Sequence, residues 1–320
     1  MEAYIQQWYD VIERMKNTNT YKLVWAKSIL DLLIKTETKV ITFSDISETI
    51  LKYYWNQIYF FNLKQGPKNQ EPTLFKLVGQ AIKRYQALTQ SKQPVWFNLA
   101  LSVLQQDQTF YRELIQSMSQ TLDQDVSWRF LNIDDEVINL YHIDKKKNAS
   151  LNEVIFTDSH IAELRNHGPL LMQFLYFKWT QLLEKFNNTP RIANKIAGSE
   201  AQAIKRKSLK VYRDILLILH ENQAIKDFYT DEVIDISDIS IDHFIPWSFI
   251  YSDDIWNLVI TSKSNNSKKS NKLSDKQYLT KLKEQNLALV GKIKDLNLKE
   301  NLQDAINNNY LDKFYYDLKN

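Results

Sequence analysis

Apolar side chains recur every three to four residues through the first 120 residues, a spacing typical of helices. The predicted helices cover 21–36, 41–63, 73–88 and 93–120. Ser44 or Asp45 is expected to cap the second of these helices, and its aromatic face is expected to be core rather than a surface that stacks bases. Gly66 and two prolines break the pattern within 64–72.

The pattern changes after residue 126. β-branched and aromatic runs of strand length predict strands within 126–133, 136–143 and 152–157. Helical spacing returns near Asp158 and continues to about 187, and a long helix is expected over 191–222. Residues 275–320 predict one or two amphipathic helices.

One segment between these helices has a different order. "ISIDHFIP" alternates like a strand that stops at Pro246, and "WNLVIT" (256–261) predicts a second strand after a long loop. A helix is expected to follow, capped by Ser264 or Asn265. The order is strand, loop, strand, helix. In this arrangement Asp242, His243 and Asn266 can converge on one point.

Composition limits the remaining possibilities. The chain has 320 residues, 44% of them hydrophobic, but only five glycines and six prolines, which favours long helices over many short strands. It has no cysteine, which excludes disulfides, thiol nucleophiles and thiolate zinc sites. The N-terminal segment lacks the apolar core of a signal peptide, and the most hydrophobic segment, 169–183, is interrupted by Gln173 and Lys178. We therefore expect a cytoplasmic protein with no membrane partner.

The charge pattern around the strand–helix segment points to a phosphate backbone. The net charge is only +3, but residues 261–283 contain seven lysines and one acid, Asp275. Carboxylate and amide oxygens suit Mg²⁺, and a neutral histidine suits a general base. The residues expected to contact nucleic acid are Lys263, Lys268, Lys269, Lys272, Arg206 and Arg213. For the two arginines, an exposed helix face with no such role is an equal alternative.

These residues resemble the core of the HNH nucleases, the ββα-metal family that includes colicin, homing, restriction and RNA-guided nucleases. The resemblance covers about 35–50 residues and rests on the "DH..P.SF" opening at Asp242–His243, then Asn257, then Asn266 followed by lysines. It implies that His243 is the general base and that Asp242 and Asn266 hold Mg²⁺, Mn²⁺ or another divalent cation. It also implies that Asn257 holds His243 in orientation.

The sequence departs from the family at four positions. Many HNH proteins carry a structural zinc on two Cys-x-x-Cys pairs, whereas this chain has Asp227, Thr230, Ser262 and Asn265 at the equivalent places. No structural zinc is expected. Packing of aromatic residues is expected to brace the fold instead. These residues are Phe228, Tyr229, Phe249 and Trp256.

The resulting prediction is an α+β, mainly helical protein. Residues 1–190 would form a helical recognition, dimerisation or partner-binding region, and 191–320 an HNH nuclease domain with its core at about 225–285. The expected activity is metal-dependent cleavage of DNA, in restriction or antiphage defence, because the N-terminal pattern loosely resembles standalone bacterial HNH proteins. A non-catalytic nucleic-acid-binding protein and a toxin-like effector controlled by a regulatory partner, with RNA as a further substrate, stay open, as does a homodimer.

Overall fold

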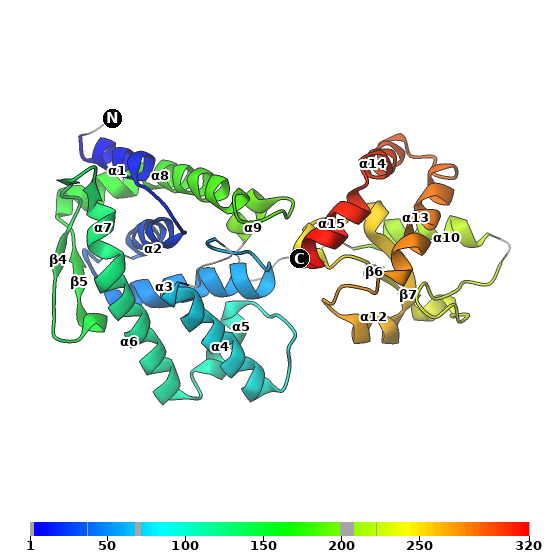
Figure 1. Ribbon diagram of the computed structural model, residues 1–320, viewed down its shortest axis with the longest axis horizontal. Coiled ribbons are helices and arrows are strands. Elements are labelled where there is room, and N and C mark those ends of the chain that lie inside the picture. The colour runs from blue at the N-terminus through cyan, green and yellow to red at the C-terminus, as the bar shows by residue number, and fades with distance from the viewer. Residues whose placement is uncertain (1–2, 37, 68–71, 199–207, 222, 320) are drawn as a thin grey trace. The chain divides into compact units, whose positions relative to one another are not determined.

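The structure is a computed structural model that describes residues 3–36, 38–67, 72–198, 208–221 and 223–319. Helices make up most of these residues and the strands are few and short, which confirms the predicted α+β, mainly helical fold (Figure 1). Within the described part of the chain, every helix is too short or too polar to cross a membrane.

The chain divides into two compact units. The first consists of Met1–Asn187 and Ile192–Ala203, and the second of Asn188–Arg191 and Ile204–Asn320. The functional assignment of residues 1–190 and 191–320 stays a prediction. The contacts group helix α9 (Ile192–Gly198) with the first unit, although the sequence placed it at the start of the second region.

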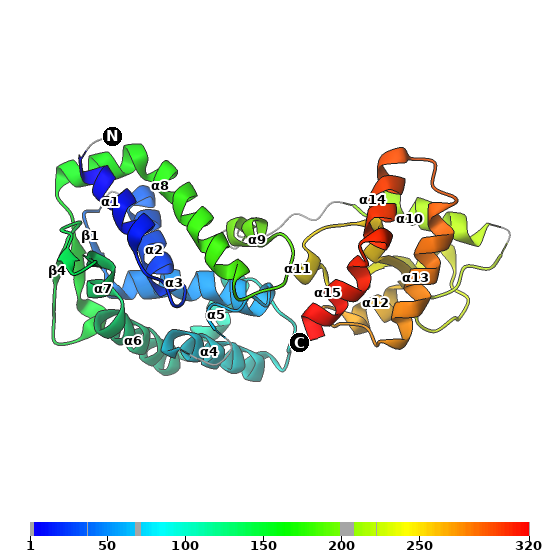
Figure 2. The ribbon, with the colours of Figure 1, turned by 45° about the horizontal axis from the view of Figure 1, so that its top comes forward.

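Helix α2 (Tyr21–Lys35) forms the centre of the N-terminal unit and contacts both α8 (Asp158–Glu184) and α3 (Phe43–Trp55) (Figure 2). Most of its residues are buried because both sides are covered. The buried set includes polar groups, since the Tyr53 hydroxyl donates to Asp31 at 2.6 Å. The other helices of this unit are α1 (Ala3–Arg14), α4 (Thr73–Thr89), α5 (Phe97–Leu104), α6 (Gln108–Asp125) and α7 (Ser127–Leu131).

Small antiparallel strands complete the N-terminal unit. One sheet has the order β1 (Val40–Thr42), β5 (Glu153–Ile155) and β4 (His142–Asp144), and a second pairs β2 (Asn132–Ile133) with β3 (Glu136–Val137). The predicted strand over 126–133 was wrong for most of its length, because α7 occupies 127–131. Val126 and Phe130 are buried while Trp128 between them is 48% exposed, which fits a helical turn, because in a strand all three side chains would share one face.

The cap of α3 also differs from the prediction. Thr42 is the N-cap, and its hydroxyl accepts a hydrogen bond from the Asp45 N–H while the Asp45 carboxylate accepts from the Thr42 N–H. Asp45 is therefore the N3 residue of a capping box rather than the cap itself. Tyr54 and Trp55 are fully buried, which confirms that this part of the aromatic face is core.

The C-terminal unit contains a β-hairpin followed directly by a helix. Strands β6 (Ile239–His243) and β7 (Leu258–Ser262) are antiparallel, with Asp242 opposite Val259 and His243 opposite Leu258. Helix α12 (Lys263–Lys269) begins at once, capped by Ser262 rather than by Ser264 or Asn265. The predicted order of strand, loop, strand and helix is confirmed.

Helices surround this hairpin. The helices are α10 (Lys210–Leu217), α11 (Trp247–Ile250), α13 (Gln277–Val290), α14 (Leu296–Asn307) and α15 (Tyr310–Lys319), so the C-terminal segment holds three helices where one or two were predicted. The long helix predicted over 191–222 is represented by α9 and α10, and residues 199–207 lie outside the described residues.

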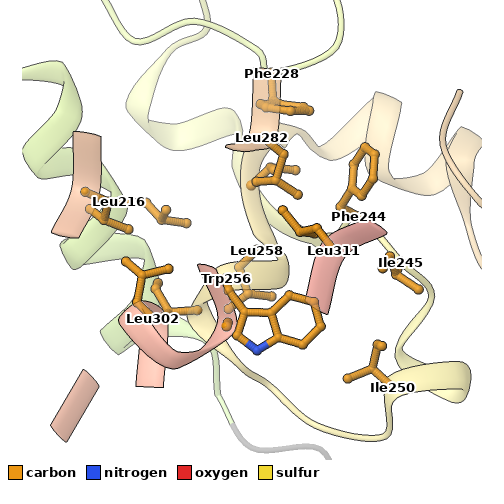
Figure 3. Packing of buried hydrophobic residues seen from close by; sticks show 14 of the residues in the cluster. Leu216, Phe228, Phe244, Ile245, Ile250, Trp256, Leu258, Leu282, Leu302 and Leu311 are labelled. Carbon is orange, nitrogen blue, oxygen red and sulfur yellow. The ribbon is translucent and has the colours of Figure 1, made fainter. Parts of the chain in front are cut away.

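A single apolar cluster holds the C-terminal unit together. Figure 3 shows Trp256, just before the second strand, and Leu258, its first residue, packed among Leu282, Leu302 and Leu311 of the three last helices. Burying each large apolar side chain contributes about 1.5–3 kcal/mol to stability. The hairpin is thus fixed by helices that lie later in the sequence.

Candidate active site

Asn257 shapes the backbone just beyond the first strand. Its amide Nδ2 donates to the Ile245 carbonyl and its Oδ1 accepts from the Ile245 N–H, both at 2.8 Å, and its own carbonyl accepts from the Phe244 N–H at 2.9 Å. Asn257 is fully buried. These bonds hold the main chain one and two residues after His243, and none of them reaches the imidazole. The orienting role predicted for Asn257 would therefore act through the backbone.

The direct partner of His243 is Asp253. His243 Nε2 lies 2.9 Å from Asp253 Oδ1, and the histidine side chain is almost fully buried. A neutral imidazole that donates its Nε2–H to a carboxylate carries its lone pair on Nδ1. The arrangement therefore fits a histidine that accepts a proton at Nδ1.

Asp242 is held by two donors from different elements. Its Oδ2 accepts from the Tyr229 hydroxyl at 2.6 Å and lies 2.9 Å from Lys269 Nζ. Burial, and then the negative charge of Asp242, raises the pKa of Tyr229, so the hydroxyl stays a donor. Burial lowers the pKa of Lys269, and the carboxylate of Asp242 opposes that shift.

Asn266 and Lys269 lie on one face of α12, three residues apart, and both contact the first strand. Asn266 Nδ2 donates to Ser240 Oγ at 2.6 Å and approaches the Ile241 carbonyl at 3.4 Å. Lys269 Nζ donates to the His243 carbonyl at 2.7 Å. The helix thus brings an amide and an ammonium group to the strand that carries Asp242 and His243.

The donor set suits a hard divalent cation. No donor among the described residues hydrogen-bonds to Oδ1 of Asp242 or Oδ1 of Asn266, so a carboxylate oxygen and an amide oxygen are left as acceptors. The described residues contain no cluster of three or more His, Cys, Asp or Glu that could hold a metal. A site with few protein ligands fits Mg²⁺ or Mn²⁺, which keep water and phosphate ligands. Asp242 and Asn266 as ligands stay a prediction.

The buried carboxylate of Asp227 joins the four positions where the resemblance places the zinc-binding cysteines of other HNH proteins. Its Oδ2 accepts from Thr261 Oγ1, the Ser262 N–H and Asn265 Nδ2 at 2.8–2.9 Å, and its Oδ1 accepts from the N–H groups of Tyr229 and Thr230 at 2.8 and 3.3 Å. Burial raises the pKa of Asp227, but these bonds outweigh it and lower the pKa overall.

Packing also braces this region, as predicted. Phe228, Phe249 and Trp256 belong to the apolar cluster, and Tyr229 packs against it. Asp227 was named from the sequence as one of the four positions that lack cysteine, but the hydrogen bonds that its carboxylate accepts were not predicted.

The residues expected to contact nucleic acid lie in different environments. Lys263, Lys268 and Lys272 are exposed, and Lys263 Nζ also donates to the Ser237 carbonyl at 2.7 Å. Lys269 is part of the site. Arg213 pairs with Asp214 at 3.3 Å. Arg206 lies outside the described residues. The contacts of these six residues with nucleic acid stay predictions.

Sequence reasoning missed Asp253. It lies in the loop between α11 and the second strand, next to another acid, Asp254, and only the fold separates their roles. Asp254 pairs with Arg191, whereas Asp253 reaches the imidazole. The sequence did contain a signal for such a partner. Two adjacent acids lie in the loop that joins the two strands, and this loop has to pass close to the end of the first strand, where His243 lies.

The first strand of the β-hairpin ends in an Asp-His pair and the second strand runs into a helix, which is the element order of the ββα-metal class. Residues 227–274 match the family model of the HNH endonucleases, and this range extends from the Asp227 hub through α12. The C-terminal part of the chain therefore contains an HNH domain, which supports a nuclease that hydrolyses phosphodiester bonds of nucleic acid. Comparisons with curated proteins and with solved structures gave no match.

Proposed function

We infer that the protein is a divalent-metal-dependent HNH endonuclease and that His243, Asp242 and Asn266 perform its reaction. The observation that carries this inference is the geometry around the end of the first strand. His243 is paired through Nε2 with Asp253, and Asp242 and the α12 residue Asn266 lie on or against the same strand.

His243 would accept the proton of the attacking water at Nδ1. Asp253, 2.9 Å from Nε2, would hold the ring in that tautomer and stabilise the charge that it gains. The water oxygen bonds to phosphorus, and the bond from phosphorus to the 3′ oxygen breaks. The products would carry a 5′ phosphate and a 3′ hydroxyl.

Asp242 and Asn266 would hold the cation through their Oδ1 atoms. When bound, the cation supplies Lewis-acid stabilisation of the phosphate and of the departing 3′ oxygen. Tyr229 would keep the Asp242 carboxylate in place through its 2.6 Å hydrogen bond to the other oxygen.

The proposal extends to DNA as the substrate and to restriction or antiphage defence as the setting. DNA is supported by the HNH match and by the excess of lysine over residues 261–283, and the setting by the loose resemblance of the N-terminal helical pattern.

The test is incubation of the purified chain with supercoiled plasmid in Mg²⁺, in Mn²⁺ and in EDTA. We expect nicked plasmid only with metal, and we expect DNA ligase alone to reseal the nicks because they carry a 5′ phosphate and a 3′ hydroxyl. Intact plasmid in both metals, or equal nicking in EDTA, would contradict the proposal.

A further inference from the structure

Lys269 differs from the other lysines near the site because it is buried against a carboxylate. Its side chain is 11% exposed and that of Asp242 is 6% exposed, and the two charged atoms lie 2.9 Å apart. Lys268, the preceding residue, is exposed. A second bond, from Lys269 Nζ to the His243 carbonyl at 2.7 Å, places the ammonium between the two adjacent site residues.

The ion pair conflicts with the role of Asp242 as a metal ligand. The ammonium group already neutralises the carboxylate that would attract a divalent cation. If the Lys269 ammonium and a divalent cation both bound the carboxylate, they would lie a few ångströms apart. Like charges at that distance repel strongly because the site is sheltered from water. Lys269 and the cation therefore compete for Asp242.

A phosphodiester removes the conflict. A phosphate placed for attack by water at His243 comes close to the Lys269 ammonium, which is hydrogen-bonded to the backbone of that residue. Lysine has a flexible stem and binds phosphate as a point charge, so Nζ can move from the carboxylate to a phosphate oxygen. Tyr229 remains on Asp242 Oδ2 and keeps the carboxylate oriented when the ammonium leaves.

We propose that Lys269 couples metal binding to nucleic-acid binding. Without a phosphate backbone it occupies Asp242 and weakens binding of the cation. With the backbone bound it transfers to phosphate and frees Asp242. This inference rests on the proposed nuclease function, and linkage makes the coupling reciprocal, so metal also strengthens binding of the backbone.

The experiment is calorimetric titration of the full chain with Mn²⁺, alone and with a phosphorothioate DNA duplex that resists cleavage. Lys269→Met keeps the length of the side chain and removes the charge. Lys294→Met, an exposed lysine of the same unit, is the matched control. A methylphosphonate duplex, which has no backbone charge, is the control for the ligand.

In the wild type and in Lys294→Met we expect the phosphorothioate duplex, and not the methylphosphonate duplex, to tighten Mn²⁺ binding about tenfold. In Lys269→Met we expect Mn²⁺ to bind about tenfold more tightly than in the wild type without DNA, with little further gain on adding the duplex.

Equal Mn²⁺ affinity of the wild type and Lys269→Met without DNA would overturn the coupling and leave the nuclease proposal in place. Absence of Mn²⁺ binding in both proteins, with and without the phosphorothioate duplex, would overturn the metal-dependent function itself. Loss of binding in Asp242→Asn identifies the titrated site as the one described.

Discussion

The carboxylate of Asp227 should contribute much of the stability of the β-hairpin and of the helix that follows it. Asp227 is 1% exposed and accepts hydrogen bonds from five donors, which lie in the turn before the hairpin, in its second strand and in α12. Replacing it with alanine removes the acceptor and leaves the donors in place. We expect Asp227→Ala to destabilise the C-terminal unit severely.

The magnitude follows from the donors that water cannot reach. Thr261 is fully buried and Ser262 nearly so, while Thr230 is exposed and Asn265 is half-buried, so water can reach the donors of these last two residues. A buried donor without a partner costs about 1–3 kcal/mol, and exposure to water offsets part of the total, so we expect a loss of about 3–5 kcal/mol. Asp227→Asn keeps the shape and one acceptor oxygen, and should cost about 1–3 kcal/mol.

Hydrogen exchange is the suitable assay because the chain has two units and need not unfold in one step. The readout is the exchange rate of peptides that cover β7 and α12. Asp231→Asn is the matched control, since Asp231 lies in the same turn with a side chain 68% exposed and asparagine tolerates its left-handed backbone, φ 59°. Wild-type protection in Asp227→Ala, or equal losses in both variants, would refute the reasoning.

The same carboxylate predicts a dependence on acid pH. The pKa of Asp227 is lower in the folded protein than in the unfolded chain, where an aspartate titrates near about 3.9. The contribution of Asp227 to the free energy of unfolding is therefore complete above that pH, and it is lost as the pH falls through the pKa of the folded protein. We expect protection of β7 to fall in this acid range in the wild type and to depend less on pH in Asp227→Asn.

Three further predictions concern the site and its support. Asp253→Ala should slow cleavage about 10–100-fold, by analogy with other residues that orient a functional histidine, and should replace the single Nε2–H tautomer of His243 by a mixture in ¹⁵N NMR spectra. An unchanged imidazole spectrum would show that Asp253 does not position the ring. Asn257→Ala should destabilise the C-terminal unit by about 2–4 kcal/mol, because it leaves the buried N–H and carbonyl of Ile245 unpaired, and exchange at Ile245 measures this loss. EDTA should leave the thermal midpoint unchanged in calorimetry, since the chain has no cysteine to hold a structural zinc, and a shift of several degrees would reveal a structural metal.

The hairpin and the order of its elements could be predicted because each has a local signal. The first strand alternates up to Pro246, and the second is a short apolar run that is buried on both faces. The strand predicted over 126–133 failed because Val126 and Phe130 serve a helical turn as well as a strand. The composition of such a short apolar run does not distinguish a helical turn from a strand.

The polar contacts of the site could not be predicted because they depend on the exact phase of the helix and on loop paths. Asn266 and Lys269 share a helix face wherever the cap is placed, but only the structure shows that this face packs against the first strand. A lysine in a basic run is normally solvated, and only the packed structure shows that this one is paired with Asp242.

The most direct test of the account is the first-order rate of DNA cleavage in Mg²⁺, with enzyme in excess, for the wild type, His243→Ala and His220→Ala. His220 is a half-buried histidine of the same unit outside the site, and it controls for the loss of an imidazole. Equal Mn²⁺ affinity and equal thermal midpoints of the three proteins ensure that only chemistry is compared. The account predicts a rate for His243→Ala at least about 100-fold below the wild type and a rate for His220→Ala close to it. A His243→Ala rate within threefold of the wild type would contradict the assignment of His243 as the general base, and with it the account of the site.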